Sequence, residues 1–315
     1  MWRMVFRRIG IGIALLWVVS VLIFAMTQVL PGDAAQIILG QQATPESLTA
    51  LRKELGLDRP AIVQYFDWLS RMATGDLGIS KAGGATIASL IEGRLSNTVL
   101  MTALVALVAV PLSIFLGLVA AMFPGSWIDR SMTFITLCLI AVPEFFIATF
   151  LVLILAVQLN WVPAISYLSG REDFWQLMRA LALPILTLTF VVSAQMIRMT
   201  RAGVLNVMNS PYIEMAILKG IPRKRIILRH ALLNAVGPIV NVVALNLAYL
   251  VSGVVVVETI FAYPGLAKLM VDGVQTRDLP LVQACAMIFC GTYVILILIA
   301  DIASILSNPR LRHPK

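Results

Sequence analysis

The chain contains too few charged residues for a soluble protein. Only 13% of its 315 residues are Asp, Glu, Lys or Arg, whereas 60% are hydrophobic. A soluble chain of this length needs far more polar side chains to cover its core. The composition therefore excludes an ordinary soluble domain and predicts a membrane protein.

Residues that perform catalysis or bind metals are also scarce. The chain has 2 histidines and 3 cysteines; Cys138, Cys285 and Cys290 fall within apolar runs and lack disulfide or metal-ligand spacing. No G-x-x-x-x-G-K-[ST] phosphate loop occurs, and no Ser/His/Asp set can be assembled at one membrane depth. We therefore expect no catalytic residue, no metal site and no cofactor in this chain, which is not expected to be an enzyme.

Long apolar runs occur six times, and each is long enough to cross a bilayer as a helix of about 20 residues. Prolines at 111, 143 and 184 fall within three of them, where neighbouring helices can satisfy the carbonyl groups that proline leaves without a donor. The first run is longer than a signal-peptide core and has no clear A-x-A site after it, so we expect a retained helix. The sequence predicts an all-α membrane protein with six transmembrane helices at 9–30, 97–123, 131–157, 180–199, 238–257 and 281–306.

Lys and Arg residues gather in alternate segments between these spans. With the N-terminus inside, the inner segments hold fourteen of the 24 Lys and Arg residues but only two acids, Asp129 and Glu214. This asymmetry follows the positive-inside rule. Both termini are therefore expected in the cytoplasm, and topology explains the net charge of +8 without a nucleic-acid partner. The inner segments are 1–8, 124–130, 198–230 and 308–315.

The first outer loop, 31–96, is the longest segment outside the predicted spans. Thr44-Pro45 is typical of a helix start and Gly56 of a helix end, and a second helix is expected to begin at Pro60. Two interpretations remain open: amphipathic helices that lie on the membrane, or a docking surface for an extracytoplasmic partner. The second helix is expected to carry one apolar face with Ile62, Phe66, Leu69 and Met72.

A short helix is marked out in the inner segment 200–237. Ser210-Pro211 is a cap followed by proline at the first helical position, and Gly220 ends the helix. Pro222 then begins another helix. An ordinary basic loop is the simplest interpretation, but such a loop needs charge and does not need two breaks around so short a helix.

Two features of this short helix suit contact with a partner. Ala216 and Gly220 are small and four residues apart, which lets another backbone come close. Glu214 lies near the N-terminal end, where the helix dipole favours an anion.

One acid, Glu144, lies near the middle of the third span, directly after Pro143. A charge at that depth is costly unless it faces a cavity or partner or is protonated. The spans contain no base that could pair with it, since Arg198 lies at the inner boundary of the fourth span. Two hypotheses stay open: Glu144 lines a polar path, or it is protonated and bonded to a neighbouring helix. Asp301, towards the inner end of the last span, is expected to be an interfacial or a packing residue near Arg310.

With this topology in place, the sequence resembles the permease subunits of ABC importers of the peptide/opine/nickel group. That family carries a cytoplasmic E-A-A-x₃-G motif, which is matched here by Glu214-Met215-Ala216 and Gly220. Met215 stands where the family has alanine, which loosens the match without changing the spacing. The downstream continuation is similar at His230–Asn234 and Pro238, with Gly237 in place of a larger apolar residue.

Other segments resemble the B-type partner of such permease pairs. These segments are Pro31-Gly32-Asp33, Leu55–Pro60 and Gly75–Gly78, which are similar to the long first loop of that partner. Two further segments resemble the family as a whole. Glu258–Gly265 is similar to its segment after the fifth helix, and Asn308-Pro309-Arg310 is similar to its Asp-Pro-Arg ending, with Asn in place of Asp.

The resemblance implies a type I ABC importer permease fold and a set of partners. They are a homologous C-type permease subunit, two ATPase subunits that bind Mg-ATP, an extracytoplasmic binding protein and the lipid of a bacterial inner membrane. It implies that the short helix couples to the ATPases and that the segment after the fifth span forms an outer gate or docking site. The implied coupling residues are Tyr212, Glu214, Met215, Ala216, Lys219, Gly220, Pro222 and Arg223; the implied gate or docking residues are Glu258, Phe261, Tyr263, Pro264 and Gly265; and Pro143 and Glu144 are the pathway candidates.

The family implies import of di- or oligopeptides as the leading hypothesis for the substrate. Nickel complexes, opines, glutathione and glycosides are the alternatives within the family. An ion-coupled secondary carrier and a non-transporting scaffold are alternatives from other classes, and ATP dependence of uptake distinguishes them.

Overall fold

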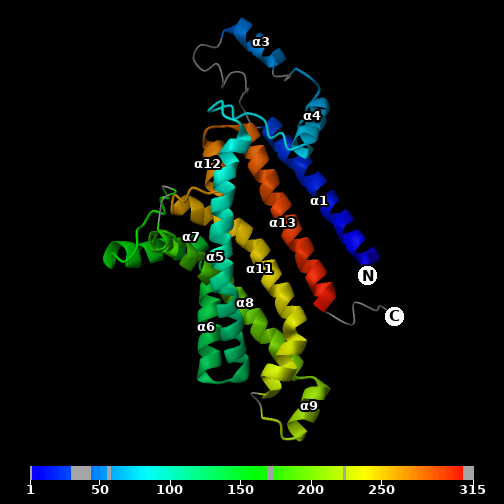
Figure 1. Ribbon diagram of the computed structural model, residues 1–315, viewed down its shortest axis with the longest axis vertical. Coiled ribbons are helices and arrows are strands. Elements are labelled where there is room, and N and C mark those ends of the chain that lie inside the picture. The colour runs from blue at the N-terminus through cyan, green and yellow to red at the C-terminus, as the bar shows by residue number, and fades with distance from the viewer. Residues whose placement is uncertain are drawn as a thin grey trace. The chain divides into compact units, whose positions relative to one another are not determined.

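The structure, a computed structural model, describes residues 2–29, 44–54, 58–168, 170, 173–222 and 225–307. Within these residues all regular elements are helices (Figure 1). They are α1 (Trp2–Val29), α3 (Pro45–Glu54), α4 (Ala61–Ala73), α5 (Ile87–Met122), α6 (Trp127–Ala141), α7 (Glu144–Leu151), η2 (Val152–Gln158), α8 (Phe174–Met208), α9 (Pro211–Leu218), η3 (Ile226–Ala231), α11 (Leu232–Ile260), α12 (Leu266–Gln275) and α13 (Leu279–Ser307).

Five of the described helices are long and apolar enough to cross a membrane. They extend beyond the predicted spans because only the central part of a spanning helix has to be apolar, and its polar ends continue outside the hydrocarbon region. The expected all-α membrane class is confirmed. The apolar stretches are Val5–Gln28, Ile87–Met122, Phe174–Met208, Asn234–Ile260 and Leu279–Ile302.

The segment expected as the third span is divided in the structure. Residues 127–141 and 144–158 form two helical pieces at an angle of 103°, and Figure 1 shows the bend between α6 and α7. Val142 is extended, with φ −89° and ψ 127°, as expected for a residue before proline. Pro143 has no N–H to continue the hydrogen bonds of α6. Unlike the prolines within α5, α8 and α11, Pro143 therefore coincides with a break.

The chain separates into two compact units. The larger unit comprises residues 1–12, 98–264 and 292–315. Its centre is α8, which packs against α6, α7 and α11. Gly117 of α5 allows a close approach to α8, because a Cβ atom there would lie 2.8 Å from the Thr200 Cβ atom and 2.9 Å from the Ile197 carbonyl oxygen. The larger unit therefore surrounds α8 with other helices.

An ion pair joins α1 to α13 in the larger unit. The Arg8 guanidinium lies 2.8 Å from the Asp301 carboxylate. The sequence-based expectation placed Asp301 near Arg310, which lies outside the described residues. The base that pairs with Asp301 comes from the opposite end of the sequence, so spacing along the chain could not identify it.

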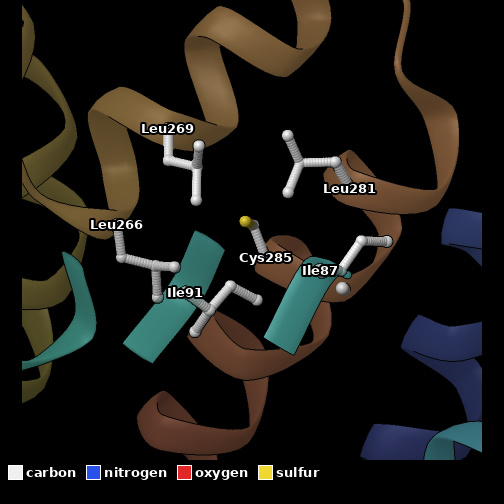
Figure 2. Close-up of a cluster of buried hydrophobic side chains, with 7 residues drawn as sticks. Ile87, Ile91, Leu266, Leu269, Leu281 and Cys285 are labelled. Atoms are coloured by element: carbon white, nitrogen blue, oxygen red, sulfur yellow. The ribbon is translucent and has the colours of Figure 1, made fainter. Parts of the chain in front are cut away.

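The smaller unit comprises residues 13–97 and 265–291 and has its own apolar core. Figure 2 shows side chains from α5, α12 and α13 that point towards one another, including Ile87, Leu266 and Cys285. Asp278 is a buried acid of the same unit, 1% exposed. Its carboxylate accepts hydrogen bonds from the Ser80 hydroxyl and from the backbone N–H of Lys81, the latter at 3.2 Å. The loop before α5 is thereby attached to the start of α13.

The helix expected after Pro60 is α4, and it contacts α1 within the smaller unit. The Tyr65 hydroxyl lies 2.8 Å from the Ser20 hydroxyl, and the Tyr65 ring packs edge-on against Phe24. Ile62 and Phe66 of the predicted apolar face remain exposed. The expected helix end at Gly56 and the segment 31–33 lie outside the described residues.

Candidate coupling site

Helix α9 has defined ends on both sides. Ser210 is extended at the N-cap position, and Pro211 occupies the first helical turn. Gly220 has φ +72°, a left-handed conformation that glycine adopts without steric cost. The N–H groups of Gly220 and Ile221 donate to the carbonyl oxygens of Ile217 and Ala216, at 2.9 and 3.2 Å, which is the Schellman arrangement. The helix end predicted at Gly220 thus corresponds to hydrogen bonds that end α9.

One side of α9 is buried against the rest of the larger unit. Ile213 and Ala216 pack with Ile226 of η3, and Met208 at the end of α8 packs against the same cluster. Their three-residue spacing places Ile213 and Ala216 on one helix face. Through this face α9 is attached to the ends of both neighbouring helices, and Figure 1 shows it beyond those ends.

The other side of α9 is exposed and largely apolar. Leu218 is 78% exposed, and Glu214 and Lys219 are exposed beside the apolar residues. Exposed apolar patches of this kind mark interaction sites more often than isolated surface residues do. Of the remaining predicted coupling residues, Pro222 is exposed and Arg223 lies outside the described residues. The other exposed apolar side chains of α9 are Tyr212, Met215 and Ile217.

Met208 connects α9 to a second cluster around the ends of three longer helices. This cluster contains Ala121 of α5, Val204 of α8 and Ala235 of α11 as buried members, with Met208 packed against it. Since Met208 also contacts the cluster of Ile213, the two clusters are continuous. The attachment of α9 therefore reaches α5, α8 and α11.

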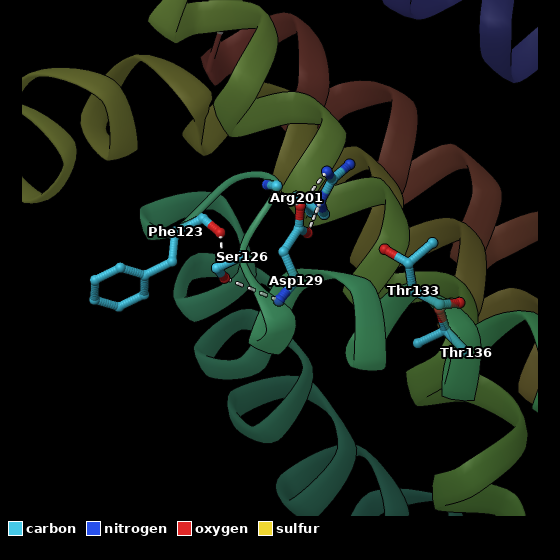
Figure 3. A network of polar contacts seen from close by, with 7 residues as sticks. Phe123, Ser126, Asp129, Thr133, Thr136 and Arg201 are labelled. Carbon is cyan, nitrogen blue, oxygen red and sulfur yellow. Dashed lines mark hydrogen bonds and ion pairs between the residues drawn. The ribbon is translucent and has the colours of Figure 1, made fainter.

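A polar network lies at the start of α6 (Figure 3). Asp129, only 3% exposed, accepts two bonds from Arg201 of α8: Nε to Oδ1 at 2.5 Å and Nη2 to Oδ2 at 2.8 Å. The backbone N–H of Gly125 donates to Asp129 Oδ2 at 2.9 Å. The Ser126 hydroxyl accepts from the Asp129 N–H at 3.3 Å and donates to the Phe123 carbonyl oxygen at 2.6 Å. The only sequence clue to this network is one acid in a basic inner segment.

Glu144, the pathway candidate, is the first residue of α7. Its Oε2 atom is buried and has no hydrogen-bond partner among the described residues. Gly253 of α11 lies alongside, because a Cβ atom on Gly253 would be 3.1 Å from Glu144 Oε2 and 3.3 Å from Leu188 of α8. Pro143 is exposed and caps the helix. The carboxylate thus lies between three helices.

The predicted gate or docking residues lie at the end of α11 and are mostly inside the protein. Glu258 is 0% exposed and its Oε1 atom accepts a hydrogen bond from the Thr98 hydroxyl at 2.6 Å. The Phe261 carbonyl oxygen accepts from the Ser166 N–H at 2.8 Å. Burial, together with the negative charge of Glu258, raises the pKa of the Tyr263 phenol, which is protonated at neutral pH as an ordinary tyrosine is.

This burial limits what the segment can do. The side chains of Glu258, Phe261 and Tyr263 cannot contact an outside partner in this conformation, because they have no exposed surface. Pro264 is half-buried, and Gly265 is buried before α12. A role as a gate does not require exposed side chains, and both roles of this segment, as a gate and as a docking site, stay predictions.

No group of three or more His, Cys, Asp or Glu side chains arranged to hold a metal ion occurs among the described residues. The three cysteines are free, and only Cys138 is exposed. Among the acids described above, Asp129 is bonded to Arg201, Glu258 accepts from Thr98, Glu144 lies beside Gly253, and Glu214 is exposed.

Two protein families match the chain. Residues 113–313 match the family described as binding-protein-dependent transport system inner membrane component, and residues 1–114 match the N-terminal part of such membrane components. The probable peptide ABC transporter permease protein y4tP of Sinorhizobium fredii is 33% identical over 309 residues, which cover 98% of this chain and 99% of that protein. The glutathione transport system permease protein GsiC of Shigella flexneri and of Escherichia coli is 34% identical over 307 residues, covering 98% of this chain and 97% of GsiC.

Proposed function

The chain belongs to the family of inner-membrane components of binding-protein-dependent transport systems, and from this premise we propose that it translocates small peptides. It is a permease subunit of an ABC importer and a multi-pass protein of the bacterial inner membrane. The observation that carries the substrate class is similarity over nearly the whole chain both to a probable peptide permease and to a glutathione permease. Glutathione is itself a tripeptide, so small peptides are the chemistry that the two names share.

Within this importer, α9 serves as the contact to the ATPase subunits. Its capped ends keep it helical, one face holds it to α8 and η3, and the opposite apolar face is exposed for a partner. The positive-inside asymmetry supports a cytoplasmic position for α9 and for both chain termini. Two ATPase subunits binding Mg-ATP, a homologous C-type permease subunit and an extracytoplasmic binding protein complete the assembly.

Glu144 lines the translocation path in this proposal. A carboxylate oxygen that is buried among three helices without a hydrogen-bond partner in the described part of the chain is available to a passing polar group. Alternating access requires the path to open to one side at a time, which needs helices that move as units. The bend between α6 and α7 beside Glu144 is where such a movement can alter the path.

Uptake into vesicles tests the function. The complex is purified through an affinity tag on this chain, reconstituted with its binding protein, and supplied with labelled alanyl-alanine or labelled glutathione. We expect ATP-dependent, vanadate-sensitive uptake of at least one of the two. Uptake driven by an ion gradient without ATP would indicate a secondary carrier, and ATP-dependent uptake of neither peptide would reject the substrate class.

The role of α9 is tested with a substitution on its exposed face. Replacing Leu218 by Gln removes apolar surface that is 78% exposed and should leave the fold intact. Less of the ATPase subunits should then co-purify with the chain. If Leu218 lies at the centre of the contact, the affinity between the permease and the ATPase subunits should fall about tenfold. Arg225→Gln, an exposed change just outside α9, is the matched control and should leave the amount unchanged. Equal recovery of ATPase with Leu218→Gln would argue against this contact.

A further inference from the structure

The ion pair of Asp129 and Arg201 lies on the route by which a movement of α9 can reach the membrane helices. Arg201 is one turn before Val204 and two turns before Met208 on the same side of α8. Val204 belongs to the buried cluster that joins α5, α8 and α11, and Met208 packs against both this cluster and the buried face of α9. Helix α9 is therefore linked to Arg201 through the end of α8.

Asp129 extends this link to α6. The carboxylate meets Arg201 through two parallel hydrogen bonds, at 2.5 and 2.8 Å, a geometry that fixes the orientation of both side chains. The N–H group of Gly125 holds the same carboxylate, and Ser126 caps the turn of the helix that carries it. If α8 shifts along its axis, Arg201 shifts with it. The start of α6 must then follow, or both hydrogen bonds to Asp129 break.

The position of α6 gives this attachment a consequence for transport. Helix α6 runs from Trp127 to Ala141, directly before the bend at Pro143 and the Glu144 carboxylate. Helix α7, in turn, packs against α8 and α11. The ion pair therefore lies at the start of α6, and the bend lies at its end.

We propose that Asp129 and Arg201 are positioning residues that clamp α6 to α8, so that movement of α9 by an ATPase is passed to the α6–α7 bend. The inference rests on the proposed function, because it assumes an importer driven through α9. Stability alone is a weak reason for such a pair, since replacing a buried ion pair by apolar residues is often neutral. Two parallel hydrogen bonds between helices do, however, fix the relative position of the two side chains, so a displacement of one helix is passed to the other.

The test separates coupling from folding by measuring transport per ATP hydrolysed. The complete complex is purified through a tag on this chain and reconstituted with its binding protein, and uptake of labelled alanyl-alanine or glutathione is measured together with stimulated ATP hydrolysis. Asp129→Asn and Arg201→Gln should lower the number of substrates imported per ATP at least about threefold. Arg201→Lys keeps the charge but cannot form both hydrogen bonds, and should give a smaller loss. Arg198→Gln, an exposed change one turn earlier on α8, is the control and should leave the ratio unchanged.

The outcomes separate the clamp from simpler roles. A defect of folding or assembly lowers uptake and hydrolysis together, so an unchanged ratio in Asp129→Asn and Arg201→Gln would overturn the inference. The inference would also be overturned if Asp129→Asn, Arg201→Gln and Arg201→Lys all failed to assemble into the complex. The ion pair would then serve folding only. Absence of ATP-dependent uptake by the unsubstituted complex would instead reject the proposed function.

Discussion

Two acidic residues in the first turns of α6 and α7 occupy similar positions and have different surroundings. Asp129 of α6 is held by Arg201, by the N–H of Gly125 and by the hydroxyl of Ser126, which accepts from its backbone N–H. Glu144 of α7 has one carboxylate oxygen that is buried and has no hydrogen-bond partner in the described residues. Both helices place the acid where the helix dipole is favourable to a negative charge. Position in the helix therefore does not separate the two acids, whereas their partners do.

Asp129 therefore has a structural role, whereas the carboxylate of Glu144 is available to contact a substrate. The bonds of Asp129 are made within the chain and attach α6 to α8. The carboxylate of Glu144 lies between α8 and α11, with Gly253 leaving space beside it. An acid that contributes to the fold should lower stability when its partner is removed. An acid that serves transport should alter uptake and leave stability nearly unchanged.

Removing Arg201 should give the largest effect on stability. Arg201→Ala leaves the Asp129 carboxylate buried without its cation, and breaking such a pair from one side costs about 3–5 kcal/mol. Thermal unfolding of the purified complex in detergent measures the change, and a large fall in the midpoint is expected. Arg198→Ala is the matched control, since Arg198 is exposed on the same helix and should change the midpoint little. Equal unfolding midpoints for Arg201→Ala and Arg198→Ala would mean that the ion pair with Asp129 does not stabilise the fold. Asp129 would then not differ from Glu144 in its structural role.

A substitution at Gly117 should have the next largest effect, because it acts on the stretch of α8 that carries Arg201. The Cβ atom of Gly117→Ala would lie 2.8 Å from Thr200 Cβ and 2.9 Å from a backbone oxygen, so α5 has to move away from α8. Overpacking of this kind costs about 1–3 kcal/mol. The same measurement on Gly93→Ala, where no atom lies within 4 Å of the new Cβ, provides the control within α5. Alanine favours a helix interior over glycine by about 0.5–1 kcal/mol, so the control should be neutral or slightly stabilising.

The contrast between Asp129 and Glu144 also shows how far the sequence could predict this molecule. The apolar runs predicted an all-α membrane protein, and the cytoplasmic motif around Glu214 indicated the permease family; the structure and the family comparison confirm both conclusions. Local signals of this kind depend on residues near one another in the chain. The ends of α9 were predictable for the same reason, because the residues that end the helix lie within or beside it.

Features that depend on distant residues could not be predicted. The partner of Asp129 is 72 residues away along the chain, and Thr98 is 160 residues from Glu258. Asp301 pairs with Arg8, which is far away along the chain. The break at Pro143 was not expected, since prolines elsewhere lie within continuous helices and the sequence does not show which carbonyl groups neighbouring helices satisfy.

Glu144→Gln should have the smallest effect on stability and a clear effect on transport. Gln keeps the shape of the side chain and removes its charge, and the buried Oε2 atom has no hydrogen bond in the described residues that the change could break. Removing a charge from an apolar environment relieves a desolvation cost, so the unfolding midpoint should stay the same or rise slightly. If the carboxylate contacts the passing substrate, the uptake rate should fall about tenfold or more, as expected for loss of a charged hydrogen bond of about 1.5–3 kcal/mol.

Two further measurements decide what a result at Glu144 means. Glu144→Ala should lower uptake at least as much as Glu144→Gln, and the binding protein should bind its peptide equally well in both cases because it is unchanged. Gly253→Ala places a methyl group 3.1 Å from Glu144 Oε2 and should displace the carboxylate while keeping its charge. Reduced uptake in all three variants, with ATPase subunits still bound, supports a carboxylate on the path. Unchanged uptake rate and substrate range in both Glu144 variants would mean that this acid, like Asp129, makes no contact with the substrate, and the distinction between α6 and α7 would have to be abandoned.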